Sequence, residues 1–238
     1  MRFYLNSIFF GLILIFTSCV EESEITFNEV EISPEGNSIV SINIPKAEGE
    51  GGISSKINTT LYNAISKSLS FGEEDEGSEK SLEDQIQNFN EEYFAFKKEF
   101  PESTQEWEAQ IDGDLMYRSN EVISIALSSY INTGGAHGIL TISFLNFDTE
   151  TGLQLENEQL FNDMEAVKSI AQLHFNDFIS ENEKMVFELA QFSLPQNIGF
   201  EEEGIVMLYN VYEVAPYASG IIQFTIPYDE ISSYLNYN

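Results

Sequence analysis

The sequence has 238 residues, of which 40 are Asp or Glu and 10 are Lys or Arg, giving a formal net charge of −30. Such a charge repels phosphate groups, so nucleic acid is excluded as a natural partner. The 13 % aromatic content, with 19 Phe and 11 Tyr, is too high for an acidic disordered chain. The length allows one large domain or two small ones around a packed core.

The chain begins with the pattern of an export signal. One basic residue precedes the apolar run Ile8–Phe16, and two small residues then lead to Cys19. The run is far shorter than the roughly 20 residues of a membrane-spanning helix. The pattern resembles a bacterial lipoprotein signal, in which residues 1–18 are removed and Cys19 is acylated. Phe16 departs from this pattern, which usually has an aliphatic residue there, and an ordinary cleaved signal is the alternative.

The residues after Cys19 predict how the protein is held. An acidic run, Glu21-Glu22-Ser23-Glu24, lies within an expected tether, residues 19–26. This run resembles the surface-export signal of lipoproteins of the Bacteroidota. We therefore expect an exported outer-membrane lipoprotein, held to the membrane through acylated Cys19, with the body either periplasmic or surface-exposed. Since Cys19 is the only cysteine, a packed core rather than disulfides must stabilise the body.

The first third of the body predicts two strands and two helices. Residues 25–44 alternate between apolar and polar around a turn at Ser33–Asn37, which is typical of a hairpin. Apolar residues then recur every four positions from Ile53 to Leu69, which predicts a helix. After an acidic loop, residues 73–80, Ser81 is the expected N-cap of a second helix. Its core-facing stripe consists of Leu82, Ile86, Phe89, Tyr93, Phe96 and Phe100.

The middle of the chain predicts strands. Residues 107–117 form either a hairpin at Asp112-Gly113 or one long strand with a bulge. Two alternating runs follow, at residues 122–131 and 139–147. The turn between them contains Gly134, Gly135 and His137.

The last third predicts a helix that begins at Asn162-Asp163, a weaker helical stretch at Lys184–Ala190, and strands at residues 205–209 and 221–226. A final helical turn follows at residues 227–230. Helices and strands segregate rather than alternate, which favours the α+β class. We expect a mainly antiparallel sheet packed against several helices in two abutting subdomains.

Several motifs occur in the order found in a known pair of domains. They are Tyr130 with Gly134-Gly135-Ala136-His137, Asn146-Phe147-Asp148 with Thr151-Gly152, Leu160-Phe161, residues 212–220, and Ile226-Pro227-Tyr228. The chain thereby resembles the paired PdaC-type and RsiV-type extracytoplasmic domain family. The resemblance implies a PdaC-type domain at residues 27–150, an RsiV-type domain at residues 151–232, and an α+β fold.

In RsiV the corresponding module is a receptor for lysozyme, a basic protein. The charge of −30 is compatible with such a ligand. The sequence contains neither an Asp-Asp pair nor a His-x-x-x-His motif, so deacetylation is not carried over from PdaC.

Two groups of residues are candidates for function. Gly134, Gly135 and His137 form a turn that serves either structure or chemistry; a glycine pair between strands most simply supplies unusual backbone conformations. The aromatic residues from Tyr209 to Tyr217 either cover the core or bind a partner. For the second role we single out Tyr212, Pro216 and Tyr217, because tyrosine is enriched in binding hot spots. His174, on the apolar face of its helix, is expected to be structural.

The sequence therefore favours a non-enzymatic binding module of the cell envelope. The expected ligand is a cationic protein such as lysozyme or a cell-wall glycan (peptidoglycan). No catalytic residue, metal ligand or cofactor site is assigned. The alternative is an envelope hydrolase or a peptidoglycan deacetylase relative that uses His137 and nearby carboxylates.

Overall fold

The computed structural model describes residues 25–49, 51–70, 80–182 and 192–237. The predicted signal at residues 1–18, Cys19, the first part of the tether and the helical stretch at Lys184–Ala190 lie outside these residues, as does nearly all of the acidic loop. Within the described ranges, no helix combines the length and the apolar content that crossing a membrane requires.

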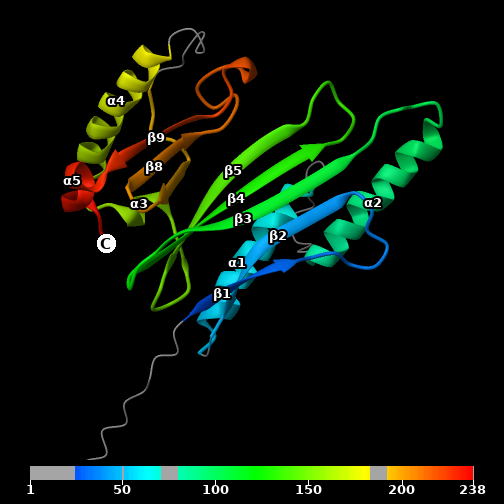
Figure 1. Cartoon of the computed structure of the whole chain (residues 1–238), viewed down its shortest axis with the longest axis horizontal. Helices are drawn as coiled ribbons and strands as arrows, with labels where there is room; N and C mark the ends of the chain where they lie inside the picture. Colours follow the sequence, from blue (N-terminus) through cyan, green and yellow to red (C-terminus); the bar gives the residue numbers. More distant parts are fainter. Residues whose placement is uncertain (1–24, 50, 71–79, 183–191, 238) are drawn as a thin grey trace, which may run out of the picture.

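Six strands form the larger sheet, in the spatial order in which they follow one another in the chain (Figure 1). They are β1 (Thr26–Glu31), β2 (Val40–Glu48), β3 (Glu108–Arg118), β4 (Val122–Asn132), β5 (Ile139–Asp148) and β6 (Gln154–Leu155). All neighbours pair antiparallel except β2 and β3, which pair parallel because two helices connect them. Residues 108–118 are thus one strand, and its register shifts between Leu115 and Tyr117.

Two helices cover one face of this sheet: α1 (Ile53–Ser68) and α2 (Leu82–Glu99). The predicted stripe of α1 is buried at Ile57, Leu61 and Ile65. Ser81 caps α2 in a capping box with Asp84, as the sequence predicts. The expectation for the end of the α2 stripe was wrong, since Phe100 is the C-cap residue after the helix and is 51 % exposed.

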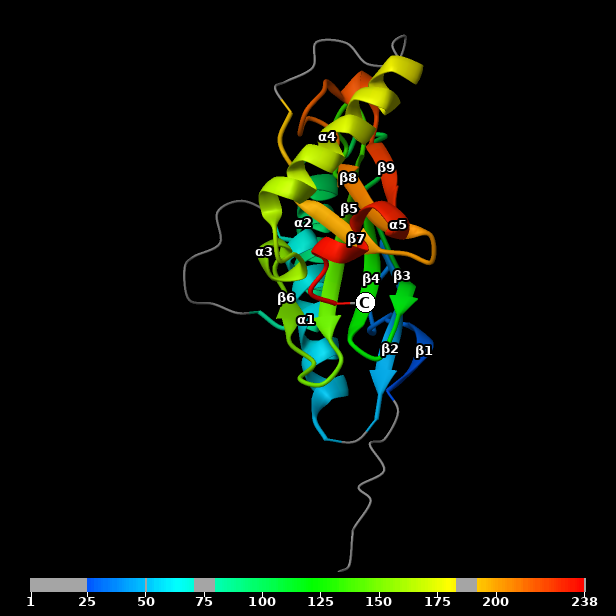
Figure 2. The same cartoon turned by 90° about the vertical axis from the view of Figure 1, so that its left-hand side faces the viewer.

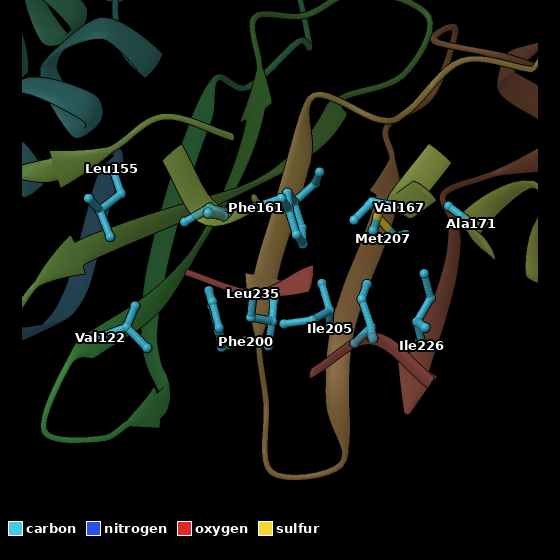
Figure 3. Packing of buried hydrophobic residues seen from close by; sticks show 13 residues of the cluster. Val122, Leu155, Phe161, Val167, Ala171, Phe200, Ile205, Met207, Ile226 and Leu235 are labelled. Carbon is cyan, nitrogen blue, oxygen red and sulfur yellow. The ribbon is translucent and has the colours of Figure 1, made fainter. Parts of the chain in front are cut away.

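The smaller sheet consists of β7 (Asn197–Phe200), β8 (Gly204–Tyr209) and β9 (Ile222–Pro227), all antiparallel. It lies against the other face of the larger sheet, and α4 (Met164–Glu181) lies on its outer side (Figure 2). The short helices α3 (Asn157–Leu160) and α5 (Tyr228–Ile231) close its lower end. A shared apolar core joins these elements to Val122 of β4 (Figure 3).

The two sheets are joined by hydrogen bonds to the free edge of β7. Asn146 Nδ2 of β5 donates to the carbonyl oxygen of Ile198 at 2.8 Å, and the amide of Phe200 donates to Ser124 Oγ of β4 at 3.1 Å. Both side chains are buried, and they lie opposite each other on paired strands. Gly199, between the two bonded residues, lies directly against the ring of Phe144.

The α+β class, the mainly antiparallel pairing and the helices that cover the sheet are therefore confirmed. The sequence did not predict β6, α3 or β7. Each has only two to four residues, too few for a periodic pattern to develop.

Gly199→Ala tests the junction between the sheets. A Cβ atom at this position would lie 2.2 Å from the Phe144 ring, so either the ring or the two sheets must shift. We expect a loss of about 1–3 kcal/mol in the free energy of unfolding, measured by urea denaturation. Gly135→Ala is the matched control, because its Cβ would meet nothing nearer than 3.8 Å. Equal denaturation midpoints for Gly199→Ala and the unmodified protein would show that the contact is not tight.

Candidate functional site

The turn between β4 and β5 is built around two glycines. Gly134 has a φ of 80°, which favours glycine, and its amide donates to Asn132 Oδ1 at 3.0 Å. Gly138 is buried, and a Cβ there would lie 2.4 Å from the ring of Tyr130. Gly135 is exposed, and its φ is not in the left-handed region. The turn is thus shaped at Gly134 and Gly138, and it presents His137 to solvent.

The loop between β8 and β9, residues 210–221, is fastened to this part of the larger sheet by Asn210. Its side chain donates from Nδ2 to the carbonyl oxygen of Ile142 at 2.8 Å, and its Oδ1 accepts from the Ile142 amide at 2.9 Å. Glu213 in turn accepts from the Asn210 amide at 2.9 Å and from the Gln196 amide at 2.9 Å. These bonds hold the start of the loop on the outer edge of β5.

The two candidate groups meet in space. The rings of His137 and Tyr217 stack with centroids 3.9 Å apart and an interplanar angle of 19°. The Tyr217 hydroxyl donates to the carbonyl oxygen of Gly138 at 3.3 Å, and Tyr212 lies on Tyr217 with centroids 5.8 Å apart. We call His137, Tyr212 and Tyr217 the aromatic platform. Figures 1 and 2 show both loops at the end of the molecule opposite the start of β1.

The backbone of Tyr212 presents its ring outward. Tyr212 has a φ of 70°, and it is the one residue other than glycine with a positive φ among the described residues. A bulky residue in this region is strained by about 1–3 kcal/mol. Its side chain is 63 % exposed, and Ile139 and Leu140 at the start of β5 are exposed as well. Strain combined with exposure of a large aromatic ring is typical of a surface that contacts something else.

The other aromatic and proline residues of the loop have different roles. Tyr209 is fully buried in β8, and its hydroxyl donates to the carbonyl oxygen of Ser193 at 2.6 Å. Burial raises the pKa of the Tyr209 phenol, so it stays protonated. Pro216 is exposed and begins the 3₁₀ helix Tyr217–Ser219, which places Tyr217 against His137. Sequence reasoning missed Asn210, whose one signal was a polar residue directly after a fully apolar strand.

Each histidine makes one polar side-chain contact in the structure. His137 Nδ1 lies 3.2 Å from the carbonyl oxygen of Gly138, to which it donates a hydrogen bond when Nδ1 carries a proton. His174 Nε2 lies 3.0 Å from Glu230 Oε2, and its ring packs parallel to Phe224. Across the described ranges, no group of three or more His, Cys, Asp or Glu side chains could hold a metal ion.

One charged network lies where the end of α2 meets the segment before β3, and Gln105 of that segment lies against Gly134 of the β4–β5 turn. The Tyr93 hydroxyl forms a short hydrogen bond to Glu106, and Lys97 Nζ lies 2.9 Å from Glu106 Oε1. These two hydrogen bonds, that of Tyr93 being the stronger influence, lower the pKa of the Glu106 carboxyl. The network lies beside Trp107, whose ring contacts Phe89, Tyr93 and Phe96.

Residues 33–140 match the family model described as Deacetylase PdaC, and residues 153–229 match that of a protein of unknown function, DUF3298. A DUF3298 family member from Bacteroides fragilis is 18 % identical with a TM-score of 0.64, and the match covers 91 % of this chain and 96 % of that one. A DUF3298 family protein from Pseudomonas aeruginosa is also 18 % identical, with a TM-score of 0.58 and coverages of 90 % and 94 %. No curated protein matches the chain.

The chain is therefore a paired PdaC and DUF3298 domain protein, and its two structural neighbours share its fold. The aromatic platform takes its residues from both matched regions: His137 from the PdaC match, and Tyr212 and Tyr217 from the DUF3298 match. The platform thus exists only where the two regions meet.

Asn210→Ala tests how the platform is fixed. It leaves the amide and the carbonyl of Ile142 without partners, which costs about 1–3 kcal/mol. We expect this loss in urea denaturation, together with faster hydrogen exchange at the Ile142 amide. Asn28→Ala is the matched control, because it removes one exposed bond to Glu48. Unchanged exchange at Ile142 would contradict the anchoring role of Asn210.

Glu106→Gln tests the charged network through pH. A carboxyl with a lowered pKa stabilises the folded state above its unfolded pKa, and this contribution is lost as the pH falls through the folded pKa. The unmodified protein should therefore exceed Glu106→Gln in urea midpoint at pH 7. The difference should shrink as the pH falls from about 4, the ordinary pKa of a glutamate, towards the lowered pKa of the folded state, where the carboxyl becomes neutral like the amide. A difference that stays constant from pH 7 to acid would refute the ionised network.

Proposed function

We propose that this chain is a cell-envelope lipoprotein, anchored through acylated Cys19, whose folded body binds a cationic protein such as lysozyme. The body would face either the periplasm or the exterior from the outer membrane. The observation that carries the binding role is the aromatic platform, with its strained and exposed Tyr212. The ligand class follows from the charge of −30, which attracts a basic protein and speeds encounter.

The position of the platform supports this proposal. The described chain starts at the lower end of the molecule in Figure 1, whereas both platform loops lie at the upper end. A tether attached before residue 25 would leave the platform pointing away from the membrane. Stacking on His137 and the bond to Gly138 hold Tyr217 in place before any ligand arrives. A preformed surface lowers the entropy cost of binding.

The alternative function is an envelope hydrolase or a deacetylase relative that uses His137. The name of the PdaC family model favours this alternative. The environment of His137 favours the binding role instead, because one face of its ring lies on Tyr217 and its Nδ1 contacts the adjacent carbonyl oxygen. A cell-wall glycan is the second ligand class compatible with a binding module.

Titration of the purified protein with hen lysozyme tests the proposal. We expect binding at low salt that weakens as salt is added, since exposed charges are screened. Tyr212→Ala should weaken binding about 30-fold, the effect of removing a hot-spot side chain worth about 2 kcal/mol. Leu153→Ala is the matched control, because Leu153 is 56 % exposed and follows the turn after β5, where its carbonyl oxygen accepts from the amide of Asp148 at the end of that strand.

Three results would count against this proposal. Absence of lysozyme binding at low salt would remove the cationic ligand, and equal affinity for Tyr212→Ala would remove the platform as its site. Turnover of peptidoglycan fragments that His137→Ala abolishes would establish the enzymatic alternative.

A further inference from the structure

A second surface, at the other end of the molecule, has different chemistry. A shallow, open pocket of about 570 Å³ lies along the first turns of α1 and the last residues of β2. Its walls include Lys46, Glu48, Ser54, Ser55, Thr59 and Tyr62. None of these residues belongs to the aromatic platform, and α1 begins at the lower end of the molecule in both overall views.

The walls of this pocket are held in place without a ligand. Asn58 Oδ1 accepts from the Ala47 amide at 2.8 Å, and Asn58 Nδ2 donates to the Ala47 carbonyl oxygen at 2.8 Å. This pair of bonds fastens α1 to β2 where β3 no longer accompanies it. Ser54 Oγ donates to the carbonyl oxygen of Gly49 at 3.0 Å, which fixes the entry to the helix. The pocket is therefore preformed.

The polar groups of the pocket have capacity left for a ligand. Ser54 and Thr59 donate their hydroxyl protons to backbone carbonyl oxygens, and each hydroxyl oxygen can still accept. Within the described part of the chain, neither the Lys46 ammonium nor the Ser55 hydroxyl has a hydrogen-bond or ion-pair partner. Glu48 Oε2 accepts from Asn28, which leaves its second oxygen for a ligand hydroxyl. Donors and acceptors are thus interleaved over one surface.

Charge and shape select the ligand class. Among the described residues of its walls, one lysine and one glutamate balance in charge, in a chain whose net charge is −30. Neutrality disfavours the cationic partner proposed for the platform and disfavours an anion equally. Hydroxyl groups that both donate and accept match such a surface. The half-buried ring of Tyr62 adds a flat apolar wall. We infer that this pocket binds a neutral oligosaccharide, whose sugar rings combine hydroxyl edges with apolar faces.

The inference shares the binding role proposed above and assigns a glycan, the second ligand class named there, to a site separate from the platform. Lysozyme binding at the platform and sugar binding at the pocket can therefore fail separately. The probes are two soluble tetrasaccharides: chitotetraose, which carries N-acetyl groups, and cellotetraose, which does not. Each is titrated into the purified full-length protein by calorimetry. We expect saturable binding of at least one tetrasaccharide. Binding of chitotetraose alone would show that N-acetyl groups are required, whereas binding of cellotetraose would show that they are not.

Two variants assign the binding to the pocket. Lys46→Ala and Tyr62→Ala should each weaken it about tenfold, whereas the platform variant Tyr212→Ala should leave it unchanged. Tyr62 packs against the core, so Tyr62→Ala could lose binding because it folds less well. Lys46 is not part of this core cluster, and Lys46→Ala therefore tests the pocket independently of folding. Failure of both sugars to bind at millimolar concentration would overturn the inference. So would binding that Lys46→Ala leaves intact, or binding that Tyr212→Ala abolishes.

Discussion

Two buried side chains of the larger sheet, Asn146 and Ser124, hydrogen-bond the edge of β7. Without them, the carbonyl of Ile198 and the amide of Phe200 would be buried without partners, at about 1–3 kcal/mol each. A strand normally obtains these bonds from a neighbouring strand, but β7 lies against the face of the larger sheet instead. These polar contacts therefore set where the smaller sheet sits, and they also place the β8–β9 loop beside the β4–β5 turn.

Asparagine side chains serve the same purpose at two further strand edges. Asn58 bonds both backbone groups of Ala47, and Asn210 bonds both backbone groups of Ile142. A carboxamide can do this because it carries a donor and an acceptor, as a peptide unit does. Each asparagine thereby closes a strand edge that could otherwise pair with another chain. Each also positions a candidate binding surface, since Asn58 fastens the wall of the pocket and Asn210 fastens the platform loop.

The sequence predicted elements whose pattern is long and local. The stripes of α1 and α2, the Ser81 cap and the alternating strands β4 and β5 follow from spacing alone. The sequence could not decide between a hairpin and one long strand for residues 107–117, because Asp112-Gly113 suits a turn. The structure shows one strand, since the pairing of β3 with β4 continues through Asp112 and Gly113. β7 had no pattern of its own, since its burial depends on the sheet against which it lies.

The sequence singled out the residues of the aromatic platform, but it did not predict that they contact one another. His137 and Tyr217 are far apart in sequence, and their stacking depends on the junction made by Asn146 and Ser124. Tyr209 and Tyr212 belong to one aromatic run, yet one is fully buried in β8 and the other is 63 % exposed beyond its end. Because the platform draws residues from both sheets, a ligand that spans it must favour the docked arrangement. Binding of such a ligand would stabilise the junction by mass action, and would couple the far end of the molecule to the interface between the two sheets.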